Sequence, residues 1–497
     1  MFLLAADRRR FLALITVCLA QLMIVLDTTI VNVALPNIQR DLHFSQGSLT
    51  WVINAFLVTF GSFLLLAGRL GDLAGRKRVF LAGLTIFTVA SLLCGLADSA
   101  ATLIGARFLQ GVGAAMQASV ILAIIVTEFP EPQERAAAMS AYVFTAVAGG
   151  SLGLLLGGIL TQLLNWHWIF FVNLPIGVGA ALAGRRLIPA DRGAGFGAGL
   201  DWVGSLLVTV ALAAAVYGIV ESSSAGGWGA AHTLAPLGLA VLLLGAFGAW
   251  EARHPNPIFP LRIFNLRGLM LSSLVRGFMV TGMYGMWFLG TLYLERILHY
   301  GALETGLAFL PWTLTVAVLS LGINRRLVNR FGAVAVMVGG IATATLGMLL
   351  LVLCGAHTGY LPLPFLAFLA LGLGIGNTFT PLMTVAVADV PHADAGLASG
   401  IVNVSQQVAG ALGLALLATL ATAHTSALVH GGEPLGPALI SGYHLAFLIG
   451  AGALLAALGL VLTVLRAHVP GRGRAPGPNR QSAPAPSRQE VGDEVAV

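Results

Sequence analysis

The sequence predicts an all-α polytopic membrane protein with 14 transmembrane helices. Hydrophobic residues make up 57% of its 497 residues and charged residues only 9%, whereas charged residues are about a quarter of an ordinary globular protein. Long apolar stretches recur along the whole chain, and the basic residues gather in alternate connections between them. These observations make the lipid bilayer the solvent of this chain.

The predicted spans are apolar stretches long enough to cross a hydrocarbon core of about 30 Å at about 1.5 Å per helical residue. They lie near residues 11–35, 49–67, 79–97, 101–125, 136–162, 168–188, 202–221, 234–250, 268–292, 305–324, 333–354, 361–385, 395–421 and 443–465. The first stretch exceeds about 20 residues and no small-residue cleavage site closes it, so we expect a retained helix and not a signal peptide.

The basic residues predict the orientation. An even number of spans places both termini on one side of the membrane. If that side is cytoplasmic, the 26 Lys and Arg residues all lie in cytoplasmic segments, apart from Arg40 and Arg296 in outer loops and Arg107 and Arg276 within spans. The positive-inside rule therefore predicts cytoplasmic termini. The abundance of Arg, Ala and Gly suggests a bacterial source, and hence a multi-pass protein of the bacterial cytoplasmic membrane.

Two sequence echoes predict a duplicated architecture. "GSLGLL" at 150–155 recurs as "GALGLA" at 410–415, and Gly75 and Gly83 recur as Gly332 and Gly340, at offsets of 260 and 257 residues. Two homologous six-helix halves around a central cavity are typical of secondary transporters. We therefore predict an N-terminal half at 1–190, two inserted helices with their linkers at 191–267, a C-terminal half at 268–466 and a disordered cytoplasmic tail at 467–497.

Several function classes are excluded by what the sequence lacks. It has no phosphate-binding loop for ATP, no clustered His and Cys spacing for a metal, and no paired catalytic groups, so we expect neither an enzyme nor a cofactor. The net charge of +6 follows from the cytoplasmic loops and does not indicate nucleic acid. The expected partners are a small lipophilic substrate, protons and the bilayer, and we expect a monomer.

The loop after the second span carries the most specific motif. It reads "GRLGDLAGRKR", with Gly68, Asp72, Gly75 and Arg76 at fixed spacing. Its glycines permit a tight turn, and the carboxylate can accept hydrogen bonds from Arg or from a helix N-terminus. The alternative is that its charges only anchor the topology.

Four motifs together resemble the major facilitator superfamily, and within it the 14-helix drug:proton antiporter family. They are the loop at 68–78, "LDTTIVNVALP" at 26–36, "RFLQGVGAA" at 107–115 and "WHWIFFVNLPIG" at 166–177, where His167 replaces the usual Arg. The resemblance covers residues 8–466. It implies that Asp72 and Arg76 latch the two halves closed on the cytoplasmic side, and that Asp27 and Arg107 serve in proton coupling.

Asp27 also stands out without the resemblance, because a carboxylate deep in a spanning helix costs about 2.5–3.5 kcal/mol on insertion scales. By helical rise it lies roughly 24 Å along the first span, and Arg107 lies roughly 10 Å in from the opposite face. The two are thus expected at similar depths, where they could pair. The alternative to proton coupling is a permanent structural ion pair.

Polar and aromatic residues within the spans are candidates for a substrate cavity, with helix packing as the alternative for each. They are Asn32, Asn54, Gln110, Gln117, Tyr284, Trp287, Trp312, Asn377, Asn403, Gln406 and Gln407. Arg276, about 12 Å into its span, either extends toward the membrane surface or faces the cavity, where it would bind an anionic group or close a gate. Such a cavity suits varied lipophilic compounds better than sugars.

The fifth span carries Gly149, Gly153 and Gly157 at a spacing that lets another helix approach closely. It resembles the antiporter motif of exporters, with Leu154 in place of the motif's proline. The sequence therefore predicts a proton-coupled secondary transporter that exports small lipophilic compounds by alternating access. An importer or uniporter of the same fold is the alternative.

Overall fold

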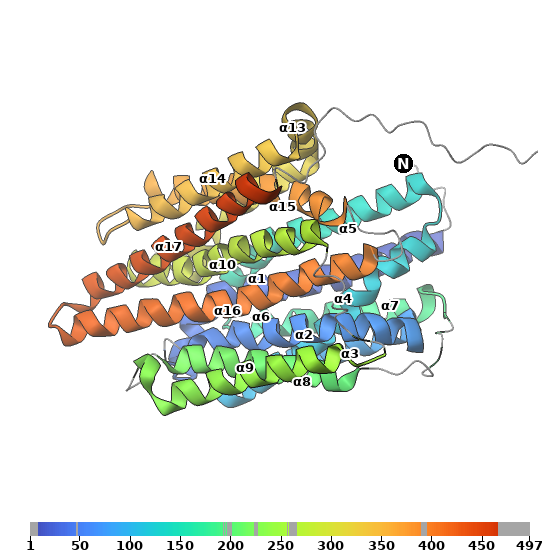
Figure 1. The fold of residues 1–497 in the computed structure, drawn as a ribbon, viewed down its shortest axis with the longest axis horizontal. Coiled ribbons are helices and arrows are strands. Elements are labelled where there is room, and N and C mark those ends of the chain that lie inside the picture. The colour runs from blue at the N-terminus through green and yellow to red at the C-terminus, as the bar shows by residue number, and fades with distance from the viewer. Residues whose placement is uncertain are drawn as a thin grey trace, which may run out of the picture.

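The computed structural model describes residues 8–45, 48–191, 193, 195, 201–222, 227–255, 257, 266–388 and 395–465. Every regular element in these residues is a helix, as predicted (Figure 1). A helix bonds its backbone polar groups within its own segment, which the interior of a bilayer requires. The predicted tail at 467–497 lies outside the described residues.

The helices fall into three consecutive groups along the chain. The first contains α1 (Arg8–Asp41), α2 (Trp51–Ala74), α3 (Arg76–Gly95), α4 (Ala100–Glu128), α5 (Pro132–Leu163), α6 (Trp168–Phe171) and α7 (Asn173–Leu187). The second is the pair α8 (Trp202–Glu221) and α9 (Ala231–Glu251). The third contains α10 (Arg267–Arg296), α11 (Ala302–Ala308), α12 (Leu310–Val318), α13 (Asn324–Phe331), α14 (Ala333–Val352), α15 (Leu363–Ala388), α16 (Ala395–His430) and α17 (Leu435–Leu460).

Within the described residues, 11 helices are long and apolar enough to cross a membrane. The predicted spans at 136–162, 268–292 and 305–324 are not among them, although the first and third overlap the shorter apolar helices Leu152–Leu163 and Ala302–Val318. The chain is therefore a multi-pass membrane protein, and the count of 14 spans stays a prediction.

Some helices differ from the predicted spans at their ends or in their continuity. Helices α1 and α16 continue to Asp41 and His430, beyond the predicted ends at 35 and 421, because apolar composition locates the lipid-facing part of a helix and not its last turn. The predicted span at 305–324 is interrupted, since a π-helical turn at Leu319–Ile323 contains Gly322 with φ of 115°. Glycine allows this backbone conformation without a steric penalty.

The two sequence echoes occupy corresponding places in the fold. Gly75 joins α2 to α3 with φ of 99°, and Gly332 joins α13 to α14 with φ of 87°. Helix α5 packs against α1, and α16 packs against α10 (Figure 1). This correspondence supports two homologous halves, whose boundaries at 190 and 268 remain predictions.

Helices α8 and α9 form an antiparallel pair at the margin of the bundle, where α8 contacts α2 and α16 (Figure 1). Asp201 connects the start of α8 to the end of α9. Its carboxylate accepts hydrogen bonds from the backbone N–H of Gly204 and from the indole N–H of Trp250, both at 2.7 Å. The first of these bonds caps α8.

Candidate functional site

A cavity of about 1340 Å³ lies among helices from the first and third groups. Its wall includes Asp72 and Arg76 of the loop at 68–78, and the Asp72 side chain is 57% exposed, so the cavity reaches the surface at this end of the bundle. We call this end, which carries residues 68–78, the latch end. From there the cavity extends inward to Trp287 and Trp312.

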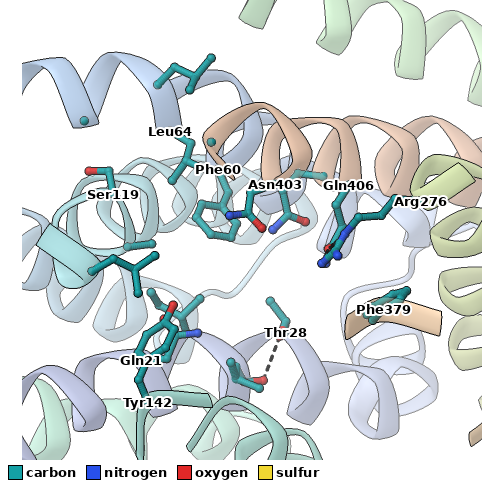
Figure 2. Close-up of a pocket in the computed structure, with 18 of the residues that line it drawn as sticks. Gln21, Thr28, Phe60, Leu64, Ser119, Tyr142, Arg276, Phe379, Asn403 and Gln406 are labelled. Atoms are coloured by element: carbon teal, nitrogen blue, oxygen red, sulfur yellow. Dashed lines mark hydrogen bonds between the residues drawn. The ribbon is translucent and has the colours of Figure 1, made fainter. Parts of the chain in front are cut away.

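Helices of the first and third groups form facing walls of the cavity, and both walls carry polar and aromatic side chains (Figure 2). Helices of the first group contribute polar, aliphatic and aromatic side chains, namely Gln21, Thr28, Phe60, Leu64, Ser119 and Tyr142, besides the charged residues at the latch end. Helices of the third group contribute amides, large aromatic rings and one cation, namely Tyr284, Trp287, Trp312, Phe379, Asn403, Gln406 and Arg276. The Trp287 ring meets Tyr284 and Trp312 edge to face, with centroids 5.5 and 4.9 Å apart. The inner end of the cavity is therefore an aromatic surface.

The structure divides the predicted cavity residues into two sets. Those that line the cavity are Arg276, Tyr284, Trp287, Trp312, Asn403, Gln406 and Gln407. Those outside its lining are Asn32, Asn54, Gln110, Gln117 and Asn377. Phe379 lines the cavity and was missed, although an aromatic residue within a predicted span is the same signal that singled out Trp312.

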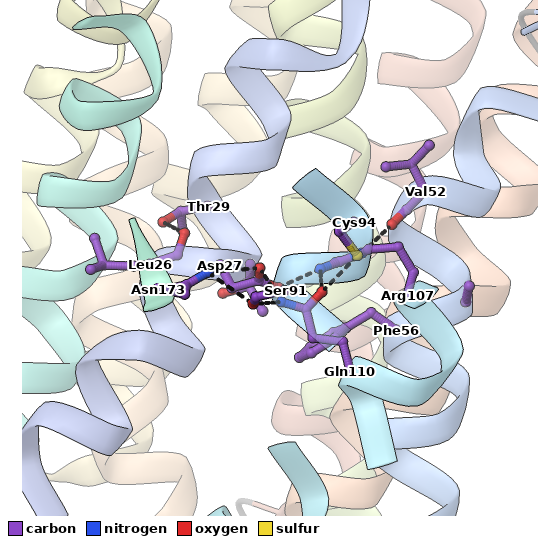
Figure 3. A network of polar contacts seen from close by, with 12 residues as sticks. Leu26, Asp27, Thr29, Val52, Phe56, Ser91, Cys94, Arg107, Gln110 and Asn173 are labelled. Atoms are coloured by element: carbon purple, nitrogen blue, oxygen red, sulfur yellow. Dashed lines mark hydrogen bonds and ion pairs between the residues drawn. The ribbon is translucent and has the colours of Figure 1, made fainter. Parts of the chain in front are cut away.

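Asp27 and Arg107 form an ion pair inside the first group of helices, as expected from their similar depths (Figure 3). Their side chains are 0% and 1% exposed, and neither lines the cavity. Gln110 donates to Asp27 Oδ1 at 2.7 Å and accepts from Arg107 Nη1 at 2.7 Å. Gln110 thus belongs to this polar cluster because it lies one helical turn from Arg107.

Two further side chains complete the cluster, and both were missed from the sequence. Asn173 of α7 donates to Asp27 Oδ1 at 3.5 Å, and Ser91 of α3 accepts from Gln110 Nε2 at 2.7 Å (Figure 3). Asn173 falls inside the motif "WHWIFFVNLPIG", which could have pointed to it. Every group bonded to the Asp27 carboxylate is a donor, an arrangement that matches an ionised, acceptor-only carboxylate.

Besides its ion pair with Asp27, Arg107 contacts two neutral groups. Its Nε donates to the Val52 carbonyl at 2.8 Å, and its guanidinium carbon lies 4.6 Å from the centre of the Phe56 ring. A guanidinium gains from such a ring face when it is removed from water. Arg107 is the only charged partner of Asp27 in the cluster.

The glycines at 149, 153 and 157 of α5 face α1. A Cβ at Gly149 would come within 3.2 Å of Val25, one at Gly153 would overlap the Thr29 hydroxyl, and one at Gly157 would lie 2.7 Å from the Ile30 carbonyl. These α1 residues surround Asp27 in sequence. The absence of side chains at these three positions therefore lets α5 lie directly against the segment that carries the buried carboxylate.

The sequence predicted a loop at 68–78, but these residues are the last two turns of α2 and the start of α3, with only Gly75 between the helices. The segment that follows α7 holds this junction. Asp191 accepts hydrogen bonds from the backbone N–H groups of Arg76 at 2.7 Å and Lys77 at 3.1 Å, which caps α3. Partial burial raises the pKa of Asp191, but these N–H groups outweigh it and hold that pKa below its usual range. Asp72 lies 3.9 Å from Arg76. The capping carboxylate is thus Asp191, which the sequence did not suggest.

The end of the bundle opposite the latch end is closed by direct contacts. Arg296 of α10 donates to Gln39 of α1, and the backbone N–H of Leu303 donates to Gln162 of α5 at 3.1 Å. Gly158 lets α5 meet α11, because a Cβ there would lie 2.7 Å from the Ala302 carbonyl. The structure is therefore open at one end and closed at the other.

A helical membrane bundle with a central cavity open at one end is typical of membrane transporters. The chain matches the Major Facilitator Superfamily over residues 17–414. It belongs to this superfamily and is a transporter, not an enzyme.

Its relatives include antibiotic resistance and export proteins. It is 42% identical to a puromycin resistance protein of Streptomyces alboniger, with 90% of each chain covered. It is 35% identical to the cephamycin export protein CmcT of Amycolatopsis lactamdurans, with 92% of each chain covered. The fold matches the POT family transporter PepTSo with a TM-score of 0.67 at 16% identity, covering 93% of this chain and 98% of that one.

Proposed function

We propose that this chain is a proton-coupled exporter of small lipophilic compounds that works by alternating access. The puromycin resistance and cephamycin export proteins support export as its activity. The aromatic inner end of the cavity supports lipophilic substrates, because apolar walls with few placed polar groups bind such compounds. The volume of about 1340 Å³ exceeds the common range for drug-sized ligands, which leaves room for varied shapes.

The proposed orientation places the latch end and both termini in the cytoplasm of a bacterium, in its cytoplasmic membrane. Arg69, Arg76, Lys77 and Arg78 gather at the latch end, as the positive-inside rule requires of a cytoplasmic surface. The cavity then opens to the cytoplasm, where an exporter collects its substrate. We propose that the protein acts as a monomer, since one chain encloses the whole cavity.

The proposal of proton coupling rests on one observation. The Asp27–Arg107 pair is completely buried on the side of α1 that does not line the cavity. Thr28 and Thr29 of α1 line the cavity while Asp27 of the same helix turns away from it. A rotation of α1 would therefore change both the cavity wall and the contacts of the carboxylate. Asp27 would bind a proton when the opposite end opens and release it when Arg107 and Gln110 return.

The function is tested by expressing the chain in a bacterial host that lacks its own drug pumps. The proposal expects that growth continues at higher concentrations of several lipophilic antibiotics or dyes, and that a protonophore removes the protection. In inverted membrane vesicles, a dye to which the host became resistant should enter the lumen when respiration acidifies it. Movement of that dye out of the lumen under the same gradient would identify an importer instead.

Asp72→Asn should slow transport without removing the protein from the membrane. Asp72 faces the open mouth of the cavity in this conformation, and we propose that its charge stabilises the conformation closed at the latch end. Partly exposed ion pairs contribute up to about 1 kcal/mol, so turnover should fall by up to about fivefold. Initial rates of dye uptake in inverted vesicles, at matched expression, measure the effect.

Arg78→Gln is the control, because Arg78 is an exposed charge of the same loop that does not line the cavity. If Asp72→Asn transports as fast as the unmodified protein, the loop anchors topology and does not act as a latch.

A further inference from the structure

Arg276 is the only charged residue that lines the inner part of the cavity, among the residues that the structure describes. The other charged residues of the lining, Arg69, Asp72, Arg76 and Asp201, belong to the latch end or to the start of α8. Arg276 lies nine residues into α10, about 14 Å along the helix axis. Its position is therefore within the membrane, on the wall that a substrate would meet.

The contacts of Arg276 leave its charge without a negative partner. Its Nε and Nη2 both donate to Gln406 Oε1, the first at 2.8 Å, and its guanidinium carbon lies 4.5 Å from the centre of the Phe379 ring (Figure 2). Among the described residues no carboxylate lies within 4.0 Å of it. Both partners are neutral, so they orient the guanidinium without neutralising it.

This arrangement differs from that of Arg107, the other arginine within a predicted span. Arg107 is paired with Asp27, whereas Arg276 bonds only to an amide and keeps its Nη1 without a protein acceptor in the described part of the chain. Charged residues within a membrane generally pair with each other or line a pathway for substrate or ions. Arg276 does not pair, and it faces the cavity.

The remaining polar groups at the inner end also favour a ligand that accepts hydrogen bonds. The indole N–H groups of Trp287 and Trp312 have no acceptor among the described residues. An indole nitrogen is a donor only, as is a guanidinium. Trp287 follows Arg276 by 11 residues, about 16 Å along the same face of α10, a distance that a drug-sized molecule can span.

We propose that Arg276 is an anion subsite, which binds the ionised carboxylate of amphipathic substrates whose rings rest on Tyr284, Trp287 and Trp312. The planar guanidinium is suited to a carboxylate because it presents parallel N–H donors. Gln406 and Phe379 hold it in place before the ligand arrives, which limits the loss of side-chain freedom on binding. This subsite names a substrate class for the proposed exporter and rests on that function.

Pyrenebutyrate and its methyl ester are matched probes, because they share one ring system and differ in a single charge. Their binding to the purified full-length protein can be followed by quenching of tryptophan fluorescence. The unmodified protein should bind pyrenebutyrate more tightly than the ester at neutral pH. In Arg276→Gln this preference should fall by about 10- to 100-fold, the range expected for a hydrogen bond to a charged group, while binding of the ester stays unchanged.

Two variants make the comparison specific. Arg276→Lys keeps the positive charge and loses the planar donor pair, so it should retain part of the preference for pyrenebutyrate. Arg78→Gln removes an exposed arginine at the latch end that does not line the cavity, and should retain all of it. If the unmodified protein shows no preference for the acid, the proposal is wrong. This comparison uses only the unmodified protein, so it does not depend on whether a variant folds.

The proposal is also wrong if Arg276→Gln weakens both probes equally, because Arg276 then has a structural or gating role. Proton-driven movement of the ester in proteoliposomes tests the exporter function separately, since the ester does not need the subsite. Ester transport without any preference for the acid would overturn the subsite alone. A preference for the acid without transport of either probe would support the subsite and contradict the proposed function.

Discussion

Asp27→Asn should abolish transport driven by a pH gradient while leaving substrate binding and exchange in place. Asparagine has the size of aspartate and cannot take up a proton in this pH range. The Arg107 guanidinium would keep its bonds to Val52 and Gln110 and its contact with Phe56, so the cluster should remain folded. With one proton exchanged per neutral molecule, one unit of pH gradient supports about tenfold accumulation.

In proteoliposomes, the accumulation ratio of a fluorescent lipophilic dye should therefore fall from about ten to about one at one unit of pH difference. Exchange of internal for external dye without a gradient is the positive control, because it requires no net movement of protons. Asn173→Ala is a matched variant that removes one donor to Asp27 and keeps the carboxylate; it should still accumulate dye. If Asp27→Asn accumulates dye normally, the pair is structural and coupling occurs elsewhere.

Arg107→Gln should destabilise the protein more than Asp27→Asn does. It leaves a fully buried carboxylate with only the amide donors of Gln110 and Asn173. Breaking a buried ion pair by removing one partner costs about 3–5 kcal/mol, because the remaining charge is not compensated. Adding Asp27→Asn to Arg107→Gln removes that remaining charge, so the double variant should recover part of the lost stability.

The thermal unfolding midpoints of the four proteins, purified in the same detergent, measure these effects. The expected order has the unmodified protein highest and Arg107→Gln lowest, with Asp27→Asn and the double variant between them. A double variant less stable than Arg107→Gln would mean that Asp27 is stabilised by groups other than Arg107. Neither of the two variants that lack Arg107 should accumulate dye, whatever its unfolding midpoint.

The sequence predicted the helical class and the Asp27–Arg107 pair because both depend on lengths and spacings that can be counted along the chain. Apolar length gives the spans, and counting residues from each membrane face gives the depth of a side chain. The repeated glycines at 75 and 332 could likewise be aligned by their spacing, and they share a positive φ at corresponding helix junctions. These inferences need no knowledge of how the helices are rotated.

The composition of the site depended on rotation and on distant packing, which spacing does not give. Gln110 and Gln406 look alike in the sequence, yet one bonds Asp27 and the other bonds Arg276 in the cavity wall. The Arg276 side chain faces the cavity and does not extend toward the membrane surface, because α15 and α16 lie beside α10 and supply its contacts with Phe379 and Gln406. Asp191 caps α3 across more than 100 residues of chain, so no local pattern could reveal it.

The burial of Asp27 also affects how much the protein would leak the proton gradient that we propose drives it. Its carboxylate is enclosed by Arg107, Gln110 and Asn173 and is separated from the open cavity. Water in that cavity would have to displace these donors before a proton could pass. An empty transporter waiting open at the latch end should therefore dissipate little of the gradient, and idle copies in the membrane would place little burden on the cell's energy supply.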